Sequence, residues 1–215
     1  MKIAIFGTGM VGSTIGTKLV SLGHEVKMGS RTAGNAKATA WVEANGKTAS
    51  QGTFADAAAF GEIAFNCTAG VASVAAIEAA GPKNLAGKIL VDVSNPLDFS
   101  KGMPPTLSVC NGDSTAEQLQ RACPDAKVVK ALNTMNCTLM VDPSLIKGEH
   151  DVFLSGNDAA AKGRVTEILK GWFGWKNVVD LGDLTAARGQ EMFVILWVRV
   201  YGALQSPNFN IHIAR

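Results

Sequence analysis

The sequence predicts an α/β fold: a doubly wound, mostly parallel sheet of about eight strands with a C-terminal helix. Short apolar runs alternate along the chain with segments whose apolar residues recur at helical spacing, which is typical of strands joined by crossover helices. The 215 residues, 47% of them hydrophobic, suffice for one large core but not for two full domains. We therefore expect residues 1–215 to form a single domain.

The strands are expected where apolar runs stop at glycine or at polar residues. Lys2–Phe6 is the clearest, because it is apolar after Lys2 and ends at Gly7, as a strand buried on both faces does. The expected strands are Lys2–Phe6, Glu25–Met28, Lys47–Ser50, Ile63–Cys67, Ile89–Val93, Lys127–Leu132, Asp151–Ser155 and Asn177–Leu181. Their alternation with helices implies parallel pairing through right-handed crossovers.

The helices are expected where apolar residues recur every three or four positions between capping residues. Gly23 should end the first helix, and Ser114 or Thr115 should cap a later one that has Glu117 in its first turn. The expected helices are Val11–Leu22, Asn35–Ala44, Ala55–Phe60, Val71–Ala80, Thr115–Cys123, Asp158–Phe173 and Thr185–Leu204, with a helix or loop around Met135–Leu145. Residues 94–112 show no periodicity and hold three of the seven prolines, so we expect a long irregular loop there.

The last helix, residues 185–204, is apolar on nearly all faces. A helix of this kind is buried or lies at an interface, so it either closes the fold or packs against a second copy of the chain. A homodimer is the expected assembly. Glu191 and Arg199 interrupt the apolar surface; we expect them on a solvated face, with mutual pairing or a place at the mouth of the crevice as alternatives.

Composition excludes several classes of partner. The net charge is +2 and no block of like charge occurs, which argues against nucleic acid. The longest apolar run, Met192–Val198, has 7 residues, whereas a membrane span needs roughly 20. The four cysteines have no spacing that suits a disulfide framework or a metal site. We expect a cytoplasmic protein with free thiols, no membrane contact and no metal.

A glycine-rich turn supplies the strongest functional motif. Gly7, Gly9 and Gly12 match G-x-G-x-x-G directly after the first strand and at the start of the first helix. In a Rossmann-type fold these glycines permit the tight turn, the approach of a pyrophosphate and close packing of helix on strand. The helix N-terminus then attracts the phosphates. A purely structural turn is the alternative.

The end of the second strand selects the dinucleotide. An NAD site would carry a carboxylate there, but the chain has Gly29, Ser30, Arg31 and Thr32. An arginine can meet a 2′-phosphate with two parallel hydrogen bonds, so we predict an NADP site. In the alternative interpretation Ser30 only caps the next helix and Arg31 is solvated.

Three further strand ends should complete a crevice at the carboxyl edge of the sheet. We expect Cys67, with Thr68 and Ala69, near the nicotinamide ribose, with Cys67 as a buried apolar group rather than a reactive thiol. The expected cofactor contacts are Gly7, Thr8, Gly9, Met10, Val11, Gly12, Ser30, Arg31, Thr32, Cys67, Thr68, Ala69, Asn95 and Pro96; on the side of the hydride acceptor we expect Leu97, Asn133, Thr134 and Met135. Ordinary turn chemistry is the alternative for the later strand ends. Lys130 is assigned no role.

The glycine motif, Gly29–Arg31 and the segment Val128–Thr134 together resemble the deazaflavin-dependent NADP reductases, and are similar to the cytosolic reductase domain of the six-transmembrane metalloreductases. The resemblance implies NADP(H) bound face to face with a flavin or deazaflavin, between which a hydride passes. It departs from the deazaflavin reductases at Asn133, where those proteins carry a histidine. It also lacks the membrane half of the metalloreductases, so transmembrane iron reduction is not expected.

No catalytic side chain is predicted, because hydride transfer between two bound rings depends mainly on positioning. The three histidines lie away from the expected crevice, and the single tyrosine, Tyr201, has no lysine four residues later. The leading hypothesis is an NADPH-dependent oxidoreductase acting on a flavin-type acceptor. An NADP-binding sensor without turnover and a reductase of small carbonyls or imines are the alternatives.

Overall fold

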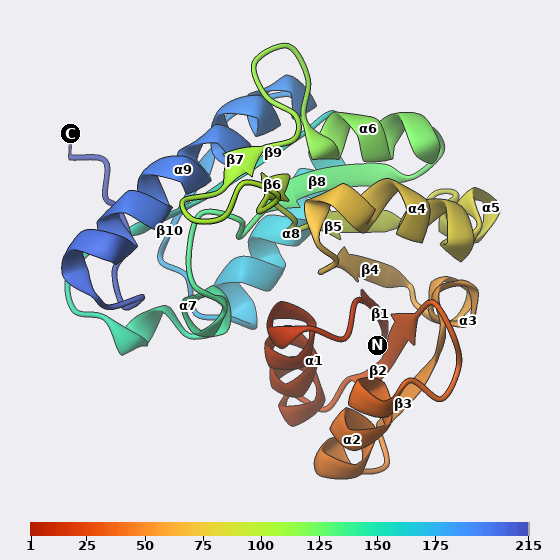
Figure 1. Ribbon diagram of the computed structural model, residues 1–215. Helices are drawn as coiled ribbons and strands as arrows, with labels where there is room; N and C mark the ends of the chain where they lie inside the picture. The colour runs from red at the N-terminus through yellow and green to blue at the C-terminus, as the bar shows by residue number, and fades with distance from the viewer. Residues whose placement is uncertain (215) are drawn as a thin grey trace.

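The computed structural model describes residues 1–214 and has one eight-stranded sheet (Figure 1). All eight expected strands are present, with ends shifted by up to three residues. They are β1 (Lys2–Phe6), β2 (Glu25–Ser30), β3 (Ala49–Thr53), β4 (Ile63–Asn66), β5 (Ile89–Asp92), β8 (Lys127–Ala131), β9 (Asp151–Gly156) and β10 (Asn177–Asp180). The predicted fold class, a mostly parallel α/β sheet with a C-terminal helix, is confirmed.

The strand order is β10-β9-β8-β5-β4-β1-β2-β3. Only the pairing of β8 with β9 is antiparallel; the other pairs within this sheet are parallel. After β3 the chain returns to place β4 on the other side of β1, so the strand order reverses there. Open α/β sheets bind ligands outside the carboxyl ends of the strands at such a switch point.

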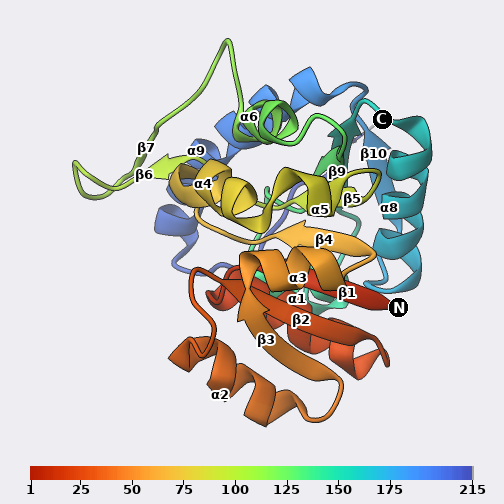
Figure 2. The ribbon, with the colours of Figure 1, turned by 90° about the vertical axis from the view of Figure 1, so that its right-hand side faces the viewer.

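Helices cover both faces of the sheet (Figures 1 and 2). One face carries α1 (Met10–Ser21), α2 (Ala36–Asn45), α7 (Cys137–Val141) and α8 (Ala159–Gly171). The other carries α3 (Phe54–Phe60), α4 (Gly70–Ala80), α5 (Pro82–Leu85) and α6 (Thr115–Ala122). Two 3₁₀ turns, Pro143–Leu145 and Leu184–Ala186, follow α7 and precede α9 (Ala187–Leu204). The expected irregular loop at residues 94–112 contains a short antiparallel pair, β6 (Leu97–Asp98) with β7 (Thr106–Leu107).

Alternation along the first strand explains the two cores. Ile3 and Ile5 pack under α1 and α2, whereas Ala4 and Phe6 pack under α3, and all four are fully buried. A strand that is buried on both faces must be apolar throughout. The sheet is therefore held between two helical layers, and its carboxyl edge stays available for a site.

The last helix is only partly covered by the rest of the chain. Among its side chains only Ala187, Gln190, Glu191 and Val194 are buried, while Leu196 and Leu204 are 56% and 57% exposed. The expectation that Glu191 faces solvent is wrong, because its carboxylate lies in the core beside α6. In residues 1–214 no helix has both the length and the apolar character that crossing a membrane requires.

Candidate functional site

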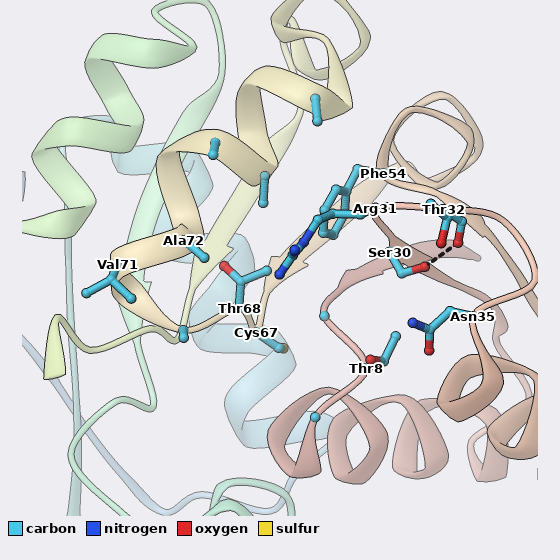
Figure 3. A pocket seen from close by; sticks show the side chains of 16 residues that line it. Thr8, Ser30, Arg31, Thr32, Asn35, Phe54, Cys67, Thr68, Val71 and Ala72 are labelled. Atoms are coloured by element: carbon cyan, nitrogen blue, oxygen red, sulfur yellow. Dashed lines mark hydrogen bonds between the residues drawn. The ribbon is translucent and has the colours of Figure 1, made fainter. Parts of the chain in front are cut away.

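The carboxyl edge of the sheet holds two adjoining hollows, which share Cys67, Thr68, Ala69 and Val71 on their walls. The first, which we call the dinucleotide hollow, has a volume of about 1030 Å³ (Figure 3). Its walls are formed by Gly7, Thr8, Gly9, Ser30, Arg31, Thr32, Asn35, Phe54, Cys67, Thr68, Ala69 and residues of α4. The sequence therefore predicted most of its polar lining.

The glycine turn has the geometry that the motif predicts. Gly7 has φ +112°, and a Cβ there would lie 2.7 Å from the carbonyl oxygen of Cys67. A Cβ on Gly12 would overlap the carbonyl oxygen of Gly7. A Cβ on Gly9 would meet nothing within 4 Å, because it would point into open space. Gly7 and Gly12 thus permit the packing of β1 and α1, while Gly9 leaves room for a ligand.

The start of α1 is open to an anion. Its N-cap, Gly9, provides no side-chain cap, and the first turn contains no acidic residue. A helix N-terminus has unpaired amides and a partial positive charge. The first turn of α1 is therefore suited to bind a phosphate.

The turn after β2 brings a cationic side chain, Arg31, to the same hollow as the N-terminus of α1. Ser30 is buried and its hydroxyl donates to the carbonyl oxygen of Thr32 at 2.7 Å. Arg31 is exposed, has no acidic partner within residues 1–214, and extends past Phe54 towards Thr68 (Figure 3). The alternative that Ser30 caps the next helix is wrong, since Asn35 caps α2 by accepting from Lys37 N at 3.0 Å.

Asn35 and Phe54 were not predicted to belong to this site. Asn35 was assigned to the body of the helix, although an asparagine at a helix start is a common N-cap. Phe54 begins α3 and packs edge-on against Phe6, so the sequence presents it as a core residue. Both lie on the wall because β2 and β3 end side by side.

The turn after β4 is fixed by polar contacts beneath it. Thr68 Oγ1 donates to Asn66 Oδ1 at 2.6 Å, and Asn66 Nδ2 donates to Asp92 Oδ1 at 2.8 Å. Burial raises the pKa of the Cys67 thiol far above its ordinary value, and the charge of Asp92 raises this pKa further. Cys67 is therefore a neutral, unreactive thiol, as expected from the sequence.

The second hollow, which we call the acceptor hollow, has a volume of about 570 Å³. Its walls are mainly apolar and come from segments far apart in the chain: Met10, Val11, Cys67, Thr68, Ala69, Val71, Val93, Ser94, Asn95, Leu97, Asp98, Phe99, Asn133, Met135, Asn136, Cys137, Met140, Val194 and Trp197. The predicted residues Asn95, Leu97, Asn133 and Met135 come together here. The contribution of α9 was not predicted.

The two asparagines hold one another in a fixed orientation. Asn95 Nδ2 donates to the carbonyl oxygen of Asn133 at 2.7 Å, and Asn133 Nδ2 donates to Asn95 Oδ1 at 2.9 Å and to the carbonyl oxygen of Gln190 at 2.9 Å. Exchanging the amide nitrogen and oxygen of Asn133 would set oxygen against oxygen at both contacts. The amide is therefore oriented by β5, β8 and α9 together.

Three predicted residues do not form part of either wall. Gly12 lies between α1 and β1, Thr134 is buried, and Pro96 is buried with its carbonyl oxygen accepting from Ser108 N at 2.8 Å. The structure thus gives them supporting positions in the turns rather than positions on a wall.

The acceptor hollow has little acid–base chemistry of its own. Asp98 is the titratable carboxyl group on its wall, and hydrogen bonds from Ser100 hold the pKa of Asp98 below its ordinary value. No histidine of residues 1–214 lines either hollow; His24, for example, lies against Trp172. The walls can therefore position a ligand, but they offer it no proton at neutral pH.

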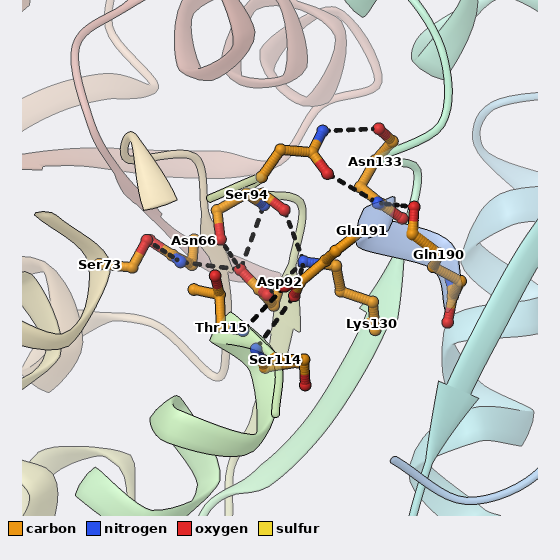
Figure 4. A network of polar contacts seen from close by, with 12 residues as sticks. Asn66, Ser73, Asp92, Ser94, Ser114, Thr115, Lys130, Asn133, Gln190 and Glu191 are labelled. Carbon is orange, nitrogen blue, oxygen red and sulfur yellow. Dashed lines mark hydrogen bonds and ion pairs between the residues drawn. The ribbon is translucent and has the colours of Figure 1, made fainter. Parts of the chain in front are cut away.

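A buried ionic cluster lies behind the acceptor hollow (Figure 4). Lys130 Nζ lies 2.7 Å from Asp92 Oδ2 and 2.8 Å from Glu191 Oε1, and it also donates to the carbonyl oxygen of Ser94. Glu191 accepts from the backbone N–H groups of Thr115 and Ala116, at the start of α6. Lys130, to which the sequence assigns no role, lines neither hollow but joins the two carboxylates of this cluster. Lys130 and Asp92 occupy paired positions in β8 and β5. Their contact could be predicted only with knowledge of which strands are neighbours and in which register they pair.

These features define a class, the dinucleotide-dependent oxidoreductases of Rossmann type. The dinucleotide hollow fits NADP(H), because Gly9 leaves its base open, the N-terminus of α1 is uncapped, and Arg31 stands unpaired near its rim. When bound, the cofactor supplies a hydride at its nicotinamide ring.

Comparison with known proteins gives the family. Residues 2–96 match a family described as NADP oxidoreductase, coenzyme F420-dependent. A structure from Arthrobacter sp. FB24, described as a candidate F420-dependent NADP reductase, is 53% identical with a TM-score of 0.94, and the match covers 100% of both chains. The chain belongs to this family of NADP-dependent oxidoreductases, and its cofactor is NADP(H). The resemblance inferred from the sequence is thereby confirmed.

Two more distant similarities extend the comparison. Metalloreductase STEAP3 from Rattus norvegicus is 32% identical over 197 residues, 88% of this chain. The chain spans 36% of the length of that relative. A reductive aminase from Aspergillus terreus in complex with NADPH and ethyl-5-oxohexanoate is 24% identical with a TM-score of 0.66, over 95% of this chain and 62% of the other, which shows a shared fold.

Proposed function

We propose that this protein transfers a hydride between NADP(H) and a flavin-type acceptor, either a flavin or a deazaflavin. The observation that supports the proposal is the pair of adjoining hollows with shared walls at Cys67, Thr68 and Ala69. One combines polar and cationic groups suited to phosphates with an apolar wall from α4, and the other is mainly apolar and suited to a flat ring system. The similarity to a candidate F420-dependent reductase points to the same class of acceptor.

The cofactor's orientation follows from the charges along the dinucleotide hollow. Arg31 binds the 2′-phosphate, and the first turn of α1 binds the pyrophosphate. The nicotinamide then lies at the shared wall, next to the acceptor hollow. Reaction at near-attack distance needs this face-to-face arrangement more than it needs a catalytic side chain.

The chemistry of the acceptor hollow favours a flavin-type ring over a small carbonyl or imine. Hydride addition to a ketone creates a localised alkoxide that requires a proton donor, whereas a flavin-type ring delocalises the added electron pair. The carboxyl group on the wall, Asp98, has a lowered pKa and donates no proton at neutral pH. The amides of Asn95 and Asn133 orient the ring, and apolar side chains from α9 exclude water.

The test is to offer the protein NADPH with a panel of acceptors and to measure NADPH oxidation by the loss of absorbance of the reduced nicotinamide. Riboflavin, FMN, FAD and an 8-hydroxy-5-deazaflavin form one arm, and small ketones and cyclic imines form the other. We expect turnover in the first arm and none in the second. Turnover with ketones or imines alone would contradict the proposal, and NADPH binding without turnover in either arm would favour the sensor.

We infer further that a second copy of the chain covers the exposed side of α9, and that the enzyme works in the cytoplasm. Met192, Leu196, Tyr201 and Leu204 form an exposed apolar surface beside Trp197, which lines the acceptor hollow. The four cysteines are free, as is usual in a reducing compartment. Leu196→Glu should convert a dimer into monomers in analytical ultracentrifugation; a wild-type monomer would contradict the inference.

A further inference from the structure

The ionic cluster behind the acceptor hollow carries an excess of negative charge. The side chains of Asp92 and Lys130 are 0% exposed and that of Glu191 is 2% exposed. Both carboxylates act only as hydrogen-bond acceptors. Asp92 accepts from Asn66, Ser94 and Lys130. Glu191 accepts from Thr115 N, Ala116 N and Lys130. Acceptor-only contacts indicate ionised carboxylates. With one ammonium between two carboxylates, the cluster has a net charge of one negative unit.

Neighbouring ion pairs do not cancel this excess. Glu117 pairs with Arg188, and Asp113 pairs with Arg121, so each pair is neutral. The start of α6 offsets part of the charge of Glu191 through its backbone amides. Although burial alone would lower the pKa of Lys130, its two carboxylate neighbours raise this pKa above the ordinary value, so the lysine stays charged. Burial of a net charge of this kind lowers the free energy of unfolding.

The negative excess adjoins the wall at which the proposed function places the nicotinamide. Asp92 ends β5, and the three residues that follow it line the acceptor hollow. Asp92 is linked through Asn66 to Thr68, on the wall that both hollows share. The field of Asp92 reaches that wall, because it contributes to the raised pKa of Cys67.

We propose that this buried net charge stabilises the positively charged, oxidised nicotinamide relative to the neutral, reduced one. Loss of a hydride from C4, with its two electrons, leaves the ring with a charge of +1, and the flavin-type acceptor takes up the hydride. A fixed negative charge nearby lowers the free energy of the ring only after that loss. Lys130, Asp92 and Glu191 are thus positioning residues that set the redox balance of the bound cofactor in favour of hydride donation.

The size of the effect follows from Coulomb's law. Two unit charges roughly 10 Å apart, at an effective dielectric constant of about 20, give on the order of a tenfold change in an equilibrium constant. The partial positive charge of the α6 N-terminus reduces this figure. We expect roughly a three- to tenfold effect on the ratio of the Kd for NADP⁺ to the Kd for NADPH.

The experiment measures this ratio by equilibrium titration without any acceptor. Glu191→Gln removes one negative charge and leaves the cluster neutral, so NADP⁺ should lose affinity relative to NADPH and the ratio should rise by the expected factor. Adding Lys130→Met to Glu191→Gln restores a net negative charge through Asp92 and should return the ratio towards the wild-type value. If Glu191→Gln changed the ratio only by disturbing the structure, the double variant, which loses more contacts, should move the ratio still further from the wild-type value.

Glu117→Gln is the matched control. Glu117 also joins α6 to α9, through Arg188 at 2.6 Å, but the pair it forms is neutral and part-exposed. Its loss leaves Arg188 unpaired, but that guanidinium is 35% exposed and solvent screens its charge, so the ratio should change far less than in Glu191→Gln. If Glu191→Gln does not fold, Asp92→Asn provides a second neutral cluster and should shift the ratio in the same direction.

An unchanged ratio in every neutral variant that folds would overturn the inference. Because no acceptor is present, this result is independent of the acceptor panel. An absence of turnover with every flavin-type acceptor would contradict the proposed function but would not change the measured ratio of the two Kd values.

Discussion

The two hollows share a wall but are built in different ways. The dinucleotide hollow takes its polar groups from turns that directly follow β1, β2 and β4. The acceptor hollow takes its walls from segments spread between Met10 and Trp197, and most of them present apolar side chains. Local turns are suited to phosphates, which many ligands share, whereas assembled side chains are suited to one particular ring. Substitutions in the first hollow should therefore change cofactor binding, and those in the second should change only the use of the acceptor.

The largest expected effect comes from the glycine turn. In Gly12→Ala the new Cβ would overlap the Gly7 carbonyl oxygen and lie 3.2 Å from Ile5 Cγ2, so α1 must move away from β1. We expect the free energy of unfolding to fall by about 2–3 kcal/mol, measured by urea denaturation, together with loss of NADPH binding. Gly9→Ala should weaken NADPH binding without that loss of stability, because its Cβ meets open space. Equal destabilisation by both variants would contradict this division of roles.

The second prediction concerns Arg31. In Arg31→Glu a carboxylate replaces the guanidinium near the 2′-phosphate, which removes charge-assisted hydrogen bonds and adds repulsion. The Kd for NADPH should rise about 100-fold, from two such bonds at roughly 1.5 kcal/mol each, while the Kd for NADH should change little. Lys47→Glu makes the same charge change at an exposed position before β3, at the opposite edge of the sheet, and should leave both values unchanged. If Arg31 is merely solvated, the two variants will behave alike.

The third prediction tests the acceptor hollow. Asn133→Leu keeps the side-chain volume but removes the amide that bonds Asn95 Oδ1 and the Gln190 carbonyl oxygen. We expect kcat/KM for the acceptor to fall about tenfold, the effect of one lost orienting contact, with the Kd for NADPH within about twofold of wild type. Asn84→Leu removes an amide that bonds Ala80 O at 2.8 Å, on α5 at the other edge, and should change neither value. A parallel loss of NADPH affinity in Asn133→Leu would place this residue in the cofactor site.

The same contrast explains what the sequence could predict. The strands, the glycine turn and the pair Ser30–Arg31 depend on neighbours in the chain, so spacing and residue type were enough. The paired positions of Asp92 and Lys130 depend on which strands lie side by side. Without the strand order, Lys130 could not be assigned a partner.

The second half of the site depends on α9, which lies more than fifty residues after β8 in the chain. Its apolar character indicated burial or an interface but not which face meets the sheet. Glu191 was expected in solvent because an isolated carboxylate is rarely buried; it is buried because Lys130 and the start of α6 satisfy it. Trp197 was similarly hidden among apolar residues, although it lines the acceptor hollow.

The smallest expected effect separates two hydroxyl groups of the dinucleotide hollow. The hydrogen of the buried Ser30 hydroxyl is donated to the Thr32 carbonyl oxygen, so Ser30 has no donor left for a phosphate. Thr32 is exposed on the wall, and its hydroxyl has no partner in the part of the chain that the structure describes. Ser30 therefore holds the turn, and Thr32 is the group that can donate to the 2′-phosphate.

Two alanine variants test this distinction. Ser30→Ala should lower the free energy of unfolding by about 1 kcal/mol, the loss of one buried hydrogen bond, and weaken NADPH binding only slightly. Thr32→Ala should leave unfolding unchanged and raise the Kd for NADPH about fivefold, with no change for NADH, which lacks the phosphate. The reverse pattern would make Ser30 the phosphate ligand, and would mean that its bond to Thr32 is exchanged when the cofactor binds.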